Sequence, residues 1–93
     1  MALEVCIFDA KDGNAQAFVD AMNAGGSAAL GAADGCRKVT ALAGVENPGQ
    51  ALLLVEWDSV EAHEAAKASD TFKIFAGIIG PFIGGAPSVL HYR

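Results

Sequence analysis

The segment at residues 50–57 constrains the fold of this chain more than any other. Residues 51–55 are apolar at every position, so the segment offers no polar side to solvent. A β-strand with this pattern is covered on both faces. A chain of 93 residues forms one domain over residues 1–93, and helices can cover one face of its sheet. We therefore expect a second copy of the chain, in a homodimer, to cover the other face.

Hydrophobic periodicity predicts the remaining elements. Short apolar or alternating runs indicate three further strands, and apolar residues at helical spacing indicate the helices. The expected strands are residues 3–8, 36–45 and 88–92, and the expected helices are residues 14–25, 58–68 and 70–79. The order βαββαβ predicts an α+β, ferredoxin-like fold, with an antiparallel four-stranded sheet and helices on one face.

Particular residues are expected to set the ends of the helices. Gly25 and Gly26 are typical of a helix C-terminus, and Ser27 could start a short further helical piece. Asp58 lies three positions before Glu61, which is the spacing of a capping box, so we expect Asp58 to cap the next helix. Asp70 is expected to cap the helix after it.

Charge and composition narrow the partners and the compartment. The formal net charge is −5 and the only adjacent basic pair is Arg37-Lys38, which argues against nucleic acid or an anionic membrane as a partner. The apolar runs are too short to span a membrane, and the acidic start of the chain matches no signal peptide. Cys6 and Cys36 fit no paired spacing and are expected to be reduced thiols of a cytoplasmic protein.

Three short segments resemble one protein family. They are residues 55–63 (VEWDSVEAH), 69–72 (SDTF) and 89–92 (VLHY), and they are similar to segments of antibiotic biosynthesis monooxygenase domains. The resemblance implies a dimeric α+β barrel, in which the sheets of two subunits pack face to face. It also implies several activities, because some members oxidise polyketide phenols to quinones without metal or flavin, others degrade haem, and relatives of the barrel are cyclases or isomerases.

The resemblance carries one residue over directly. A tryptophan at this strand-to-helix junction lines the cleft in the quinone-forming and haem-degrading branches, so Trp57 is a candidate ligand contact; the alternative is a core aromatic. By alternation, Leu53 and Val55 share the face of Trp57 and would form an apolar floor. With Phe72 they make our predicted binding set for a small aromatic or apolar ligand.

Two histidines are the candidate catalytic bases. His63 lies on the helix after Trp57, and His91 lies on the last strand. An imidazole titrates near neutrality and could take the proton of a phenol. The alternatives are a half-exposed helix residue for His63 and a hydrogen-bonded interface residue for His91.

We expect a cofactor-independent monooxygenase acting on a planar phenolic or polyketide-like molecule. Haem is disfavoured, since the asparagine and histidine of the haem-degrading members have no counterpart, and the spacing of the histidines and cysteines matches no metal site. Leu53 stands where quinone-forming members have an asparagine. That difference favours the first alternative, a non-catalytic ligand-binding module. The second alternative is a cyclase or isomerase on the same scaffold.

Overall fold

All four expected strands form, each close to the residues that predicted it. They are β1 (Ala2–Asp9), β2 (Cys36–Ala43), β3 (Gln50–Trp57) and β4 (Ser88–Tyr92). In this computed structural model, which describes all of residues 1–93, the strands make one antiparallel sheet in the order β2-β3-β1-β4. The ferredoxin-like α+β fold predicted from the sequence is confirmed.

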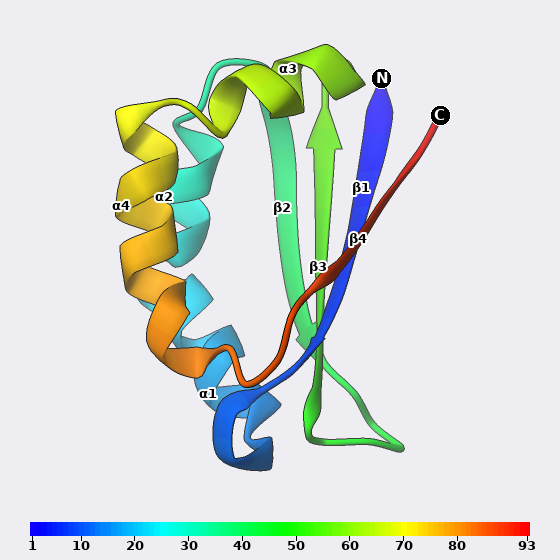
Figure 1. Cartoon of the computed structure of the whole chain (residues 1–93), viewed down its shortest axis with the longest axis vertical. Coiled ribbons are helices and arrows are strands. Elements are labelled where there is room, and N and C mark those ends of the chain that lie inside the picture. Colours follow the sequence, from blue (N-terminus) through cyan, green and yellow to red (C-terminus); the bar gives the residue numbers. More distant parts are fainter.

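The helices form a single layer. They are α1 (Ala15–Ala21), the π-helical segment η2 (Met22–Gly26), α2 (Ser27–Gly31), α3 (Val60–Ala66) and α4 (Asp70–Ile79), with short 3-10 turns η1 (Lys11–Gly13) and η3 (Gly80–Phe82). Figure 1 shows all of them on one side of the sheet, with α3 at the end where both chain termini lie. None of the helices is long and apolar enough to cross a membrane.

Strand β3 divides the sheet into two unlike faces. Leu53, Val55 and Trp57 are buried against the helices, whereas Leu52 and Leu54 between them are only half-buried. The register extends this division to the neighbouring strands, because paired residues share a face. We call the side without helices the open face. Its apolar residues are Leu3, Val5, Ile7, Leu42, Leu52, Leu54, Leu90 and Tyr92.

The prediction that Gly25 and Gly26 end the first helix is wrong. Gly26 and Ser27 keep right-handed helical dihedrals, and the chain runs from α1 through η2 into α2 without a break. Gly26 is buried, and a side chain there would meet Met22 Sδ at 2.8 Å and Ile79 at 3.6 Å. Ile79 of α4 would be at an ordinary contact distance, so the glycine leaves room for the side chain of Met22 one turn earlier and does not end the helix.

The predicted caps are each displaced by one residue. Ser59 caps α3 by accepting a hydrogen bond of 3.0 Å from the backbone N–H of Ala62, and Ser69 caps α4 in the same way. Asp58 instead pairs with Arg37 of β2. The sequence pattern assigned the Asp58 carboxylate to the cap, but its ion pair with Arg37 links the start of β2 to the end of β3.

Candidate functional site

The register of the sheet brings three polar side chains together on its helix face. Ala2 of β1 pairs with Trp57 of β3, and Glu4, two residues further along β1, pairs with Val55 on one side and His91 of β4 on the other. Glu4 is therefore diagonal to Trp57 and directly opposite His91, and all three lie on the same face. Trp57 Nε1 donates a hydrogen bond of 3.0 Å to Glu4 Oε1.

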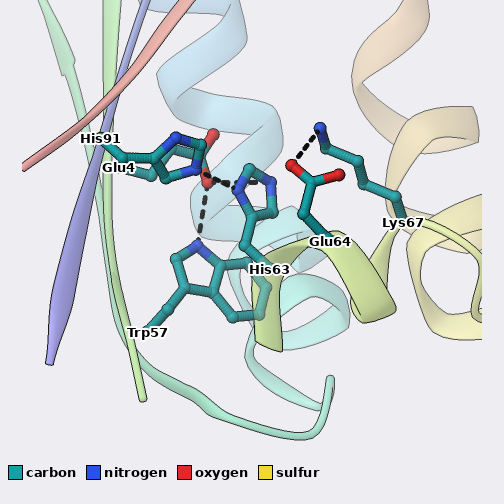
Figure 2. Close-up of polar contacts among 6 residues, drawn as sticks. All are labelled: Glu4, Trp57, His63, Glu64, Lys67 and His91. Carbon is teal, nitrogen blue, oxygen red and sulfur yellow. Dashed lines mark hydrogen bonds and ion pairs between the residues drawn. The ribbon is translucent and has the colours of Figure 1, made fainter. Parts of the chain in front are cut away.

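Helix α3 adds the fourth member of the cluster. Because its N-terminus is fixed by Ser59 directly after β3, the first turn of α3 brings His63 back over the sheet, where only 3% of its surface is exposed. Its Nε2 lies 3.3 Å from Glu4 Oε1, and its Nδ1 lies 2.7 Å from His91 Nε2 (Figure 2). The imidazole also stacks on Trp57, with ring centroids 4.9 Å apart and planes 15° apart.

The partners determine where the protons sit. A protonated Nε2 on His63 faces the Glu4 carboxylate favourably, whereas a lone pair there would face another acceptor. His63 Nδ1 is then an acceptor, and His91 Nε2–H is the donor to it. Both nitrogens of His63 are thus engaged, and one tautomer of each histidine satisfies the whole cluster.

Burial lowers the pKa of His63 below its ordinary value, and this is the largest influence on it. The negative charge of Glu4 acts in the opposite direction, and Lys67 and His91 add to the lowering. The imidazole is therefore neutral at neutral pH and keeps the lone pair on Nδ1. A neutral histidine beside a carboxylate can take up or hand on a proton.

A cavity of about 270 Å³ opens next to this cluster, between the sheet and the helices. Its wall is apolar apart from Glu4, His63 and Lys67, and these three gather beside α3, since His63 and Lys67 are one helical turn apart. The apolar lining consists of Cys6, Phe8, Leu30, Leu53, Phe72, Phe75, Ala76, Ile79, Ile83, Pro87 and Val89. The cavity therefore has one polar end and a long apolar remainder.

One oxygen of Glu4 is available to a ligand in this cavity. Oε1 is occupied by Trp57 and His63, while Oε2 makes no hydrogen bond within the protein. No buried side-chain oxygen lacks a partner, so Oε2 has accessible surface, and Glu4 lines the cavity. The free oxygen of the carboxylate thus faces the cavity.

The thiol in the cavity wall is unsuited to nucleophilic chemistry. Burial, together with the negative charge of Glu4, raises the pKa of Cys6 to about 11. Burial also raises the pKa of Cys36. A thiol with so high a pKa stays protonated at neutral pH, and the thiol form is a poor nucleophile. Cys6 therefore belongs with the apolar part of the wall.

The predicted site residues occupy different positions in this arrangement. Leu53 and Phe72 line the cavity, whereas Val55 and Trp57 are fully buried and absent from its lining. Trp57 stacks on His63 and supports it (Figure 2). His63 is buried, so its alternative as a half-exposed helix residue is wrong, and His91 points to the helix face and contacts His63.

Sequence reasoning missed Glu4 and Lys67. The signal for Glu4 was present, because it shares a period of two with Cys6 and Phe8 and so had to lie on the core face of β1. For Lys67 the only signal was its position four residues after His63, which puts both on one side of α3.

The polar cluster is not arranged as a metal site. His63 uses different nitrogens toward Glu4 and His91, so these side chains face one another in a row and do not converge on one point. No set of three or more histidine, cysteine or carboxylate side chains in the structure could hold a metal ion.

The sequence also matches a family model. The model described as antibiotic biosynthesis monooxygenase matches residues 1–77, which include β1, β3, α3 and most of α4. The chain belongs to the antibiotic biosynthesis monooxygenase family. The resemblance seen in residues 55–63 and 69–72 is thereby confirmed. No curated protein matches the chain.

Solved structures share the fold over nearly the whole chain. A Bordetella bronchiseptica protein bearing the same family name is 22% identical, with a TM-score of 0.88 over 99% of this chain and 94% of that one. A Nitrosomonas europaea protein of that name is 13% identical, with a TM-score of 0.75 over 100% and 97%. A conserved protein from Methanosarcina mazei is 20% identical, with a TM-score of 0.76 over 100% and 92%. At these identities, the likeness establishes the fold alone.

Proposed function

We propose that this protein is a cofactor-independent monooxygenase that oxidises a planar, mostly apolar phenol or enol. The observation that carries the proposal is the free oxygen of Glu4, which faces an apolar cavity and is backed by the neutral His63. A carboxylate and an imidazole in contact can remove a proton from a bound hydroxyl. Membership of the monooxygenase family supports the choice of oxygen as the second substrate.

The chemistry then follows from the substrate's own electrons. Glu4 takes the hydroxyl proton, and the resulting phenolate or enolate passes an electron to O₂. One oxygen atom ends as a new carbonyl on the substrate, the other leaves as water, and the substrate loses two hydrogens in the exchange. The role of the protein is to supply a dry cavity and a base and to stabilise the negative charge that develops.

Lys67 is the group suited to stabilise that charge. Lys67 is the only Lys or Arg among the residues of the cavity wall, and its ammonium pairs with Glu64 at 3.2 Å on the exposed side of α3. Because Glu4 is also at this end, the substrate hydroxyl would sit between a base and a cation. That is the arrangement required by a reaction in which a neutral hydroxyl becomes an oxyanion.

The cavity also favours one distribution of polar groups on the substrate. Hydroxyls at one end would meet Glu4 and Lys67, while a hydroxyl at the far end would meet Phe8, Ile79 and Ile83 and remain unpaired. A buried hydroxyl without a partner costs about 1–3 kcal/mol. We therefore expect a dihydroxynaphthalene with neighbouring hydroxyls to bind at least about fivefold more tightly than its isomer with hydroxyls at opposite ends.

The test measures oxygen uptake and quinone absorbance with a panel of dihydroxynaphthalenes and anthrones. We expect turnover by the wild type and a loss of about 10²–10⁴-fold in Glu4→Gln, which keeps the shape and the acceptor but removes the base. Glu46→Gln, in the exposed turn before β3, is the matched control and should be unaffected. Full activity of Glu4→Gln would reject the assignment of the base.

Two other outcomes correspond to the alternatives. Binding of an aromatic compound without turnover by the wild type would identify a ligand-binding module. Conversion of the substrate without oxygen uptake would identify a cyclase or isomerase, since the Glu4–His63 pair is equally able to move a proton in those reactions.

We also propose that the open face pairs with the same face of a second copy. The apolar side chains of the open face support this pairing. Among them, Leu42, Leu90 and Tyr92 are at least half exposed in the single chain. Soluble monomers seldom leave so continuous an apolar surface uncovered. An obligate interface of this kind buries more than about 2,000 Å² in total.

A further inference from the structure

We propose that Glu4, His63 and His91 form a proton path that connects the cavity to solvent at the far side of β4. The proposal rests on the proposed function, because the path serves a reaction that changes the protonation of Glu4 in a closed cavity. His91 is then a positioning and proton-carrying residue, although it does not line the cavity itself.

The first step is that the three side chains form a continuous row. His91 Nε2 is 2.7 Å from His63 Nδ1, and His63 Nε2 is 3.3 Å from Glu4 Oε1. The longer of these distances is within the range of catalytic hydrogen bonds before a ligand is bound. Trp57 holds two of the three members, by its hydrogen bond to Glu4 and its stacking on His63, so the row is fixed from one side.

The second step is that the two ends of the row open in different directions. Glu4 Oε2 faces the cavity, as described above. At the other end, His91 borders a separate surface hollow, with Val60, Glu61, Tyr92 and Arg93. His91 Nδ1 makes no hydrogen bond within the protein and is not a buried atom without a partner, so it is open to water. Only the buried His63 lies between the ends.

The third step is that the proton count balances. A proton taken from water at His91 Nδ1 releases the proton on His91 Nε2 to His63 Nδ1, and His63 Nε2–H passes its own proton to Glu4 Oε1. Each bond in the row shifts by one proton, both histidines change tautomer, and both end neutral. From the resting tautomers the row carries a proton inward, because His63 Nε2 already holds a proton and cannot accept one from Glu4. The reverse sequence starts from the shifted tautomers and returns the proton of Glu4 to water at His91 Nδ1. Glu4 can therefore exchange a proton with solvent while an apolar ligand closes the cavity.

Charged and titratable groups face the row from several elements. His63 faces Glu4 from β1, Glu64 and Lys67 from its own helix, and His91 from β4. His91 faces Glu61 of α3 and Arg93 across the surface hollow. Burial lowers the pKa of His63, so the imidazole does not retain a second proton. A residue that relays a proton between two other groups must release it in this way.

The test compares two substitutions of His91 in the full protein. His91→Gln keeps an N–H that can donate to His63 Nδ1, but an amide does not carry a proton onward, whereas His91→Ala opens space for added imidazole. We expect kcat to fall at least about tenfold in both variants and KM to stay unchanged. A fall of this size is part of the roughly 10²–10⁴-fold effect of acid–base catalysis. Imidazole in solution should restore His91→Ala and leave His91→Gln unchanged.

A merely structural role for His91 predicts a different pattern. In that case His91→Gln would keep the kcat, the pH profile and the solvent deuterium isotope effect of the wild type, and this result would overturn the path. Ser88→Ala, at the exposed start of β4 and outside both the cavity and the surface hollow, is the control for disturbance of the strand. The unfolding midpoints of all variants distinguish loss of the fold from loss of the proton path.

A second measurement does not depend on turnover. Nitrogen NMR of the wild type should show the proton of the pair on His91 Nε2, with scalar coupling across the hydrogen bond to His63 Nδ1. Absence of that coupling overturns the path even in an active enzyme. If the coupling is present and no aromatic compound is converted, the proposed function fails and the path between cavity and surface stands.

Discussion

Trp57 Nε1 donates to Glu4 Oε1 at 3.0 Å between diagonal positions on neighbouring strands, and this bond fixes the only carboxylate of the cavity wall. Because Trp57 is absent from the lining, its role is support. Trp57→Phe keeps an aromatic ring and removes the donor. We expect the free energy of unfolding to fall by about 1–3 kcal/mol, the cost of a buried group that loses its partner. Urea denaturation measures this, and Glu46→Gln in the exposed turn before β3 should change it by less than about 0.5 kcal/mol.

The stability of the protein should decrease as the pH falls below the ordinary histidine pKa of about 6.5. Burial lowers the pKa of His63 in the folded state, so below that pH the unfolded chain binds a proton that the folded chain does not. The contribution of His63 is complete above this range and is lost as the pH falls toward its folded pKa. His63→Leu should flatten the dependence between about pH 7 and pH 5.5. Equal slopes for both proteins would contradict the assigned shift.

Two glycine-to-alanine substitutions should have opposite signs. Gly35 has φ +83°, and a side chain there would lie 2.7 Å from Cβ of Ala62 in α3. We expect Gly35→Ala to cost at least about 1–2 kcal/mol, the price of the left-handed conformation alone. Gly77 lies in α4 with free space around it, so Gly77→Ala should stabilise the fold by about 0.5–1 kcal/mol. Thermal unfolding of the pair checks both signs.

The association of two copies can be tested on the open face. Leu54→Asp puts a charge at its centre without touching the helix side, and we expect the dimer to dissociate or the chain to unfold. Val45→Asp is the control, because Val45 is 84% exposed in the turn between β2 and β3. Light scattering at micromolar concentration distinguishes the states. A wild type that is a stable 9.5 kDa monomer would refute the dimer.

The sheet was predictable because each strand carries its own pattern. Leu53, Val55 and Trp57 alternate with Leu52 and Leu54, and alternation is a local property of the sequence. The helix ends were not predictable in the same way. Asp58 and Ser59 are both good caps, and the choice between them depends on Arg37, which reaches Asp58 from a distant strand.

The candidate site depended on pairing, which a single sequence does not show. The sequence identified His63 and His91, but their contact arises because Glu4 pairs with His91 in the sheet and α3 folds back over Glu4. In the sequence, Glu4 interrupts the apolar run from Leu3 to Phe8. Its position between Ala2 and Cys6 on the core face was the available sign that a carboxylate is buried there.

The stacking of Trp57 on His63 has an optical consequence. The chain contains a single tryptophan, so all of its indole emission comes from this one ring. A stacked imidazole quenches an excited indole far more strongly when it is protonated, by accepting an electron from it. The intrinsic fluorescence of the unlabelled protein therefore reports the protonation of His63, and it does so at the wall of the cavity where a ligand would bind.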